Sequence, residues 1–107
     1  MNDIPEIIWP SGYTTHLFTF RYNFENIPVL IKDALYFEDF DIAGKIRLYY
    51  IKNDEPILLY NHMNLNDNLI MVYMDNKGNS KKNFNFIVDS LNLQTDDILW
   101  IKTVVDD

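Results

Sequence analysis

Apolar and polar side chains alternate along several segments of the chain, and this period of two predicts half-buried β-strands. The segments with this alternation are 13–20, 45–52 and 56–62. In the first of them Phe18 and Phe20 are expected to face the core, with His16 in line with them. The second and third are expected to pair as a hairpin, because the four residues NDEP between them predict a turn.

Two further strands are predicted by apolar runs rather than by strict alternation. The run LIMVYM over 69–74 is almost continuous, which predicts a central strand with both faces covered. A β-branched segment over 98–105 predicts the last strand. Between them, DNKGN over 75–79 predicts a tight turn in which Gly78 adopts a positive φ. The early segment EIIWP, 6–10, is expected to be a short edge strand or an ordered arm.

The apolar period changes to that of a helix after the first strand. Apolar side chains with helical spacing occur at Ile27, Leu30, Ile31, Ala34 and Phe37. They predict a helix over 27–38, with Asn26 as its N-cap and Pro28 in its first turn.

A second helical pattern lies near the end of the chain. Its apolar positions are Phe84, Ile87, Val88 and Leu91, spaced i, i+3, i+4 and i+7. This spacing predicts a helix over 83–92, capped by Ser80 or Asn83. The letters NFNFIV in the same segment also alternate, so a strand is the alternative here.

These elements follow one another in the order β-α-β-β-β-α-β, which predicts an α+β fold with a mostly antiparallel sheet of about five strands and two helices. A length of 107 residues predicts a single domain over 1–107. The inward-facing positions predict the core. They include Phe18, Leu30, Ile31, Leu48, Leu58, Val72, Ile87 and Trp100.

Composition and charge limit the classes of partner and the cellular compartment that are expected. The chain has no cysteine, no signal-peptide pattern at its start and no apolar run long enough to span a membrane, so a cytoplasmic location is expected. Its net charge is −7, with acidic ends on either side of a mildly basic middle. The cluster Lys77, Lys81 and Lys82 flanks the predicted turn and is too small to reverse this charge. Nucleic acid and anionic membranes are therefore unexpected partners, whereas a basic protein would be attracted.

Candidate chemistry is sparse. The only histidines are His16 and His62, and each stands alone. His16 is interpreted as a packed residue, and His62, at a strand end, is expected to be more exposed. Two histidines without cysteine do not supply a zinc site. Asp39 and Asp41 form a D-x-D pair that could hold Mg²⁺, but on the predicted helix the two carboxylates point to different sides. No cofactor, metal or catalytic residue is predicted.

One segment combines three aromatic rings with three carboxylates. In YFEDFDI, 36–42, the acids Glu38, Asp39 and Asp41 cluster at the expected C-terminal end of the first helix, where the helix dipole disfavours negative charge. Packing explains the pattern as well, if Phe37 and Phe40 face the core and the acids are solvated. The other interpretation is a partner-binding face.

The residues of that face are Tyr36, Glu38, Asp39, Phe40, Asp41, Asp96 and Asp97. Small size, negative charge and the lack of catalytic motifs predict an acidic protein-binding inhibitor, of the immunity or antitoxin type, that covers the site of a basic toxin or nuclease. Three alternatives remain: a self-associating module such as a homodimer, a phage anti-defence mimic of nucleic acid, and a small enzyme that uses Asp39, Asp41 or His62.

Overall fold

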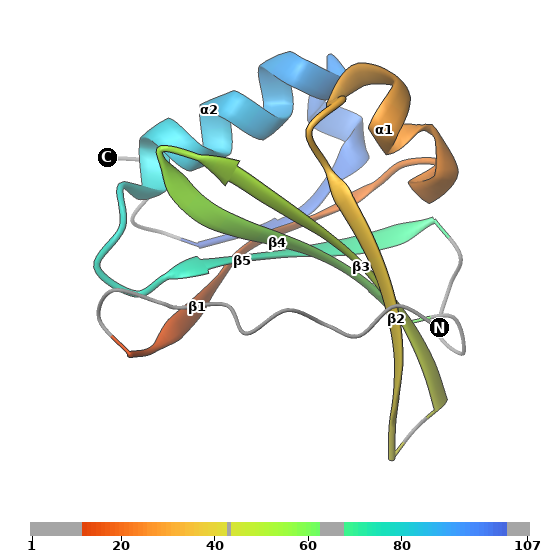
Figure 1. The fold of residues 1–107 in the computed structure, drawn as a ribbon. Coiled ribbons are helices and arrows are strands. Elements are labelled where there is room, and N and C mark those ends of the chain that lie inside the picture. The colour runs from red at the N-terminus through yellow and green to blue at the C-terminus, as the bar shows by residue number, and fades with distance from the viewer. Residues whose placement is uncertain (1–11, 43, 63–67, 103–107) are drawn as a thin grey trace.

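Six antiparallel strands form one sheet in the computed structural model, which describes residues 12–42, 44–62 and 68–102. The strands are β1 (Thr14–Arg21), β2 (Leu35–Asp41), β3 (Gly44–Asn53), β4 (Glu55–His62), β5 (Leu69–Asp75) and β6 (Ile98–Ile101). Their order across the sheet is β2-β3-β4-β5-β1-β6, and all neighbours are antiparallel (Figure 1). The predicted α+β class is confirmed, with six strands instead of about five.

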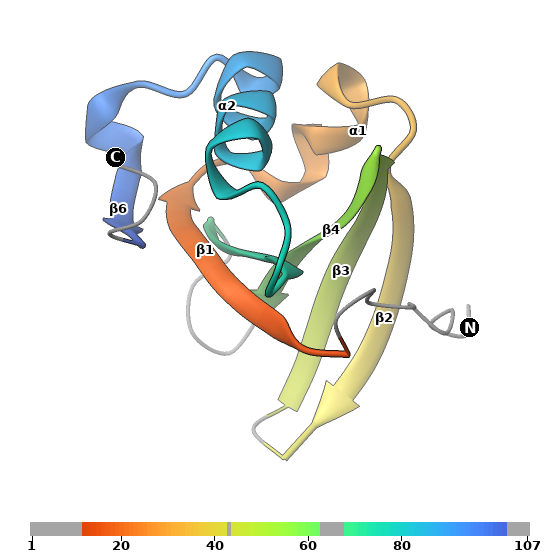
Figure 2. The same cartoon turned by 90° about the vertical axis from the view of Figure 1, so that its left-hand side faces the viewer.

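Two α-helices lie on the same face of this sheet (Figure 2). They are α1 (Ile27–Leu30) and α2 (Ser80–Leu91). Short 3₁₀ turns precede α1 at Phe24–Asn26 (η1) and β6 at Thr95–Asp97 (η2). The ring of Phe84 on α2 meets Phe18 on β1 edge-on, with centroids 4.8 Å apart, so the main core lies between α2 and the sheet.

The helix predicted over 27–38 is wrong beyond its first turn. α1 ends at Leu30, and β2 begins at Leu35 and pairs with β3 at all seven of its residues. Asn26 makes no capping hydrogen bond with its side chain, so the helix start is weakly fixed. Tyr and Phe favour strands, and a neighbouring strand supplies backbone partners that a four-residue helix cannot.

The second helix is confirmed, and the alternative of a strand at 83–92 is wrong. It begins earlier than predicted, at Ser80, and its N-cap is Asn79 rather than Ser80 or Asn83. The Asn79 side-chain oxygen accepts a hydrogen bond from the Lys82 amide at 3.0 Å. The helix ends at Asn92, which adopts the left-handed conformation with φ 52°. Ile87 and Leu91 lie on the buried side of the helix, as predicted.

Five of the eight predicted core residues are buried: Phe18, Ile31, Leu48, Val72 and Ile87. Leu30 and Trp100 are half exposed, at 50% and 48%, and Leu58 is intermediate. Leu30 is not buried because α1 ends there. Trp100 is not buried because it lies on the sheet face opposite the helices.

A β-bulge in β1 overturns the expected alignment of His16 with the core. His16 pairs with Tyr73, whereas Phe18 pairs with Val72, so the register shifts between them. Phe18 faces the helices, and His16 lies on the other face, where its ring stacks on Trp100 and Tyr73 at centroid distances of 4.6 and 5.2 Å. Thr19 holds the imidazole by a 2.7 Å hydrogen bond to Nε2. Burial lowers the pKa of His16.

Two turns differ in detail from the predictions. Asn53 pairs with Glu55, and Asp54 between them has φ 62°, so Pro56 lies within β4 rather than in the turn. The turn after β5 is confirmed, but Gly78 does not have a positive φ. The position is closely packed: a Cβ there would lie 2.3 Å from Glu55 Oε2 and 2.8 Å from Met74 Cε, so a larger residue would displace the ends of these two side chains.

The carboxylate of Glu55 fastens α2 to the β3–β4 hairpin. It accepts hydrogen bonds from the Asn79 amide at 3.1 and 3.2 Å and contacts Asn83 Nδ2 at 3.4 Å. A negative charge at a helix N-terminus is favourable. The predicted arm at 6–10 lies outside the described residues, as does the end of the strand predicted over 98–105.

Candidate functional site: the acidic edge strand

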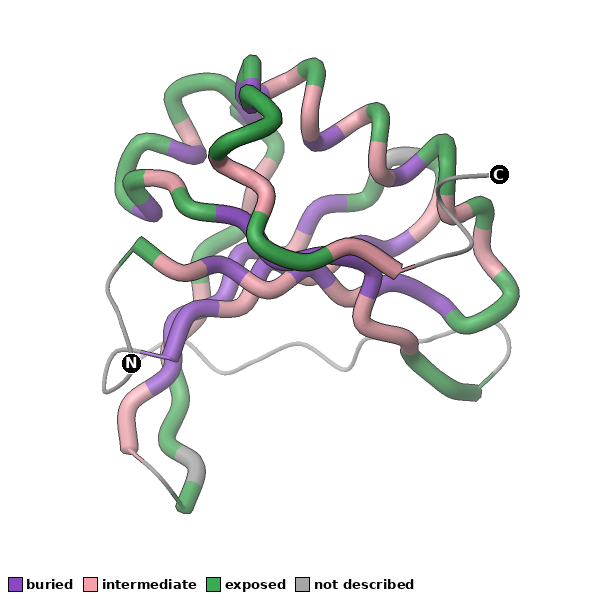
Figure 3. Tube along the Cα trace, turned by 180° about the vertical axis from the view of Figure 1, so that it is seen from behind, coloured by how far each residue is buried: buried purple, intermediate pink, exposed green. Residues whose placement is uncertain are grey.

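Among the described residues, β2 lies at one edge of the sheet and pairs only with β3. The β2–β3 hairpin extends beyond the rest of the sheet, and its tip is exposed (Figures 1 and 3). The segment YFEDFDI therefore lies in a strand whose outer side is paired with no other described strand. The sequence argument from an opposing helix dipole does not apply to it.

The register with β3 assigns each β2 side chain to a face. Tyr36 is opposite Tyr49 and Glu38 is opposite Arg47, on the face that carries the helices, and Phe40 follows in phase. Phe37 and Asp39 point to the other face. Phe37 and Phe40 therefore do not share a buried side, contrary to the packing interpretation.

Of the aromatic side chains on β2, the one nearest the hairpin tip is the most exposed. Tyr36 is 36% exposed, and it packs against Phe24 and Tyr49 at centroid distances of 6.4 and 5.5 Å. Phe40 is 66% exposed and Ile42 is fully exposed. The far half of the hairpin thus presents apolar side chains to solvent beside carboxylates.

Glu38 is already engaged within the hairpin. It accepts a hydrogen bond from the Tyr36 hydroxyl and lies 3.3 Å from Lys45 Nζ. The Tyr36 bond and Lys45 lower the pKa of Glu38, while burial and the bond to Glu38 raise the pKa of Tyr36. Glu38 is therefore a fixed carboxylate that can exchange Lys45 for another cation.

Asp39 has a local backbone partner. Its Oδ1 accepts a hydrogen bond from the Phe40 amide at 2.8 Å, and this contact is exposed. Asp39 and Asp41 sit two positions apart on a strand, so they belong to one face rather than to the two sides expected from a helix. The side chain of Asp41 lies outside the described part of the structure.

Asp96 and Asp97 are not brought together with the β2 acids. They lie in η2, immediately before β6, which is the opposite edge strand of the sheet. Asp97 has a structural role, since its Oδ2 accepts from the Gln94 amide at 2.8 Å in a capping box. Of the residues predicted to form the partner-binding face, only Tyr36, Glu38, Asp39 and Phe40 lie together on one described element, the strand β2.

The residues considered for catalysis are placed apart. Asp39 is opposite Ile46, and Ile46 is opposite His62, so the two polar residues lie in one row with an apolar residue between them. Two strand spacings, roughly 10 Å, separate them. His62 is buried rather than exposed as expected. Within the described residues, no group of three or more His, Cys, Asp or Glu could hold a metal ion.

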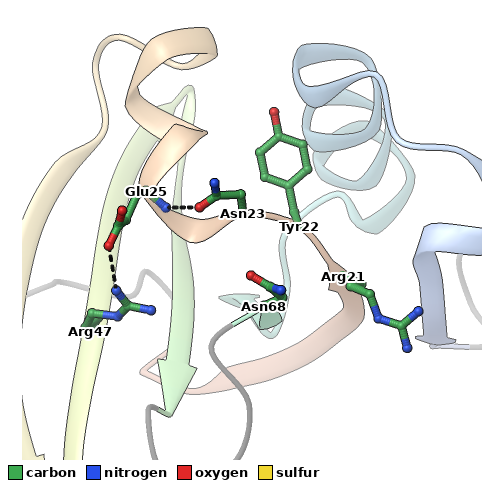
Figure 4. Close-up of a pocket in the computed structure, with 6 residues that line it drawn as sticks. All are labelled: Arg21, Tyr22, Asn23, Glu25, Arg47 and Asn68. Atoms are coloured by element: carbon green, nitrogen blue, oxygen red, sulfur yellow. Dashed lines mark hydrogen bonds and ion pairs between the residues drawn. The ribbon is translucent and has the colours of Figure 1, made fainter.

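A polar pocket of about 390 Å³ lies beside η1 and contains residues that sequence reasoning missed (Figure 4). Its lining residues are Arg21, Tyr22, Asn23, Glu25, Arg47 and Asn68. Both arginines of the chain line it, and Figure 4 shows their guanidinium groups on opposite sides. Arg47 could have been noticed, because it shares its strand phase with the buried Tyr49 and Ile51.

Arg47 is a buried cation with a fixed orientation. Its Nε and Nη2 donate to Asn61 Oδ1 at 3.1 and 2.9 Å, and its Cζ lies 4.6 Å from the centroid of Phe24. Its Nη1 is 3.7 Å from Glu25 Oε1. The arginine joins η1 to β3 and β4, and Glu25 offsets its charge. We therefore interpret this pocket as structural.

Comparisons with protein-family models, with curated proteins and with solved structures find no match. Among the described residues, no helix has the length and apolar character needed to cross a membrane.

Proposed function

We propose that this chain is a small acidic inhibitor of the immunity or antitoxin type, which binds a basic toxin or nuclease and covers its working site. The observation that carries the proposal is the outer side of β2, which no other described strand covers and where exposed apolar side chains lie beside carboxylates. Phe40 would supply apolar contact, and Glu38 and Asp39 would attract lysine or arginine.

The charge distribution supports a basic partner over nucleic acid. The net charge is −7, and the small cluster of lysines near α2 is partly neutralised, since Lys82 Nζ lies 2.7 Å from Asp54 Oδ2. Binding to phosphate chains depends on many unpaired cations. A gel shift with duplex and single-stranded DNA at physiological salt is expected to show no complex, and a salt-sensitive shift would contradict the proposal.

The main test starts from the host cell. The tagged protein is used to capture partners, and each basic candidate is purified and assayed for its own activity with and without the inhibitor. The expected result is a stoichiometric complex that blocks that activity and weakens as salt is raised. If no captured basic protein loses activity in the complex, the inhibitor function is wrong.

A charge-matched pair of variants locates the interface. The double variant Glu38→Gln and Asp39→Asn removes two negative charges from β2. Its control, Asp33→Asn with Asp89→Asn, removes two from exposed positions elsewhere. Slower association for the first variant alone is expected. Equal slowing by both variants would mean that the total negative charge, and not β2 in particular, attracts the partner.

A further inference from the structure

We infer that the partner binds β2 by strand addition: an extended basic segment pairs antiparallel with the open edge and becomes a seventh strand beside β2. This inference rests on the proposed function and specifies how the partner is held. Its basis is the main chain of β2, since an edge strand offers a row of amide and carbonyl groups to another strand.

One hydrogen bond shows which main-chain groups face outward. The Phe40 amide donates to Asp39 Oδ1, so it is not directed at β3. In an antiparallel ladder, residues alternate between facing one neighbour and facing the other. The outward groups of β2 therefore belong to Tyr36, Glu38 and Phe40, and those of Phe37 and Asp39 pair with β3.

The side chains along this edge select the chemistry of the added strand. Counted from the hairpin tip, they run acidic, aromatic, acidic, acidic, aromatic, aromatic. Cross-strand neighbours of opposite charge stabilise a pair and like charges destabilise it. The complementary strand therefore carries cations opposite Glu38, Asp39 and Asp41, and apolar side chains opposite the rings.

The same charges disfavour a second copy of the chain. An antiparallel pairing of β2 with itself centred on Glu38 would place that carboxylate opposite its own copy. In addition, Asp39 occupies the outward Phe40 amide in the free protein. A basic strand releases this bond and offers the carboxylate a cation in exchange, whereas an acidic strand offers none. The edge is thereby selective for a basic partner.

The probe is the acetylated and amidated peptide KVKKVVK, written in the order that runs antiparallel to β2 from Asp41 to Leu35. Binding is followed by NMR of the ¹⁵N-labelled protein at low and physiological salt. The expected shifts are largest for the amides of Tyr36, Glu38 and Phe40. Binding is expected to weaken in the variant Glu38→Gln with Asp39→Asn.

N-methylation of the peptide separates strand pairing from charge attraction. Methyl groups on the second, fourth and sixth residues remove the amides that would face β2, and these should weaken binding about tenfold or more. Methyl groups on the third, fifth and seventh residues lie on the outer edge and serve as the matched control. Both peptides carry the same charge.

The outcomes distinguish the two proposals. If the inner methyl groups do not weaken binding but the variant Glu38→Gln with Asp39→Asn abolishes it, strand addition is wrong. The acidic side chains of β2 then bind the partner by charge alone. No binding of the peptide, or shifts centred away from β2, also overturns strand addition, while capture of an inhibited host protein still supports the proposed function. A concentration-dependent dimer whose contacts map to β2 would replace the basic strand with a second copy.

Discussion

α2 and β2 are both amphipathic, but they are held in very different ways. α2 is covered by the sheet along its apolar side, capped at both ends, and tied to the β3–β4 hairpin through Glu55. Among the described strands β2 pairs with β3 alone, and its apolar side chains Leu35 and Phe40 remain mostly exposed. The difference indicates that α2 stabilises the fold while β2 is available for binding.

The strongest test of this contrast removes one aliphatic side chain from each element. Ile87→Ala on α2 deletes a fully buried side chain and should lower the free energy of unfolding by about 2–5 kcal/mol. Leu35→Ala on β2 deletes one that is 55% exposed and should cost less than about 1 kcal/mol. Urea unfolding of both variants measures this. Equal losses would mean that β2 belongs to the stabilising core.

A second test compares two phenylalanines. Phe84→Ala on α2 removes a half-buried ring that meets Phe18, and about 1–3 kcal/mol should be lost. Phe40→Ala should change stability by about 0.5 kcal/mol or less but weaken partner binding. Thermal melts and a binding titration are run on the same two samples. A Phe40→Ala variant with reduced stability and intact binding would reverse the assignment.

A third test removes one side-chain bond to a backbone amide from each element. Asn79→Ala deletes the N-cap of α2 and should cost about 1 kcal/mol. Asp39→Ala deletes the corresponding bond to the Phe40 amide, which is exposed, so stability should hardly change. Freeing that edge amide should instead raise self-association, measured by sedimentation over a range of concentrations. If the mass of the variant is unchanged at every concentration, Asp39 does not protect the edge of β2 against self-association.

The smallest expected effect is a pH dependence in β2. Because the folded pKa of Glu38 lies below its ordinary value of 4.5, this residue stabilises the fold above that value and the contribution is lost as pH falls through the folded pKa. Glu38→Gln should therefore flatten the acid side of the stability profile slightly. NMR titration of the Glu38 carboxyl should show its pKa rise in Tyr36→Phe, which lacks the hydroxyl donor. An unchanged pKa in that variant would exclude the Tyr36 bond as its cause.

Local patterns predicted most of the strands and α2, because each of these elements buries one consistent face. They failed at 27–38, where the apolar spacing fits a helix. The deciding factor is non-local, since β2 forms by pairing with β3. The bulge at His16 and the burial of Arg47 likewise depend on neighbours that are distant in sequence.

The candidate site was predicted in part for the wrong reason. Sequence patterning indicated that Tyr36, Glu38, Asp39 and Phe40 could meet a partner, and the structure places them on an open edge. The argument from a helix dipole is wrong because no helix lies there. Asp96 and Asp97 were joined to this face by charge alone, and charge in a sequence carries no information about which edge of a sheet it will occupy.

The position of β1 in the sheet has a consequence for how the chain is made. β1 is paired only with β5 and β6, so a ribosome delivers the partners of this strand long after the strand itself. The strand carries three side chains that are fully buried in the folded protein: Leu17, Phe18 and Phe20. They stay exposed during synthesis, while β2, β3 and β4 can already form their local hairpins. Completion of the sheet is therefore a late event in biosynthesis, and β1 is the segment that a chaperone would be expected to protect.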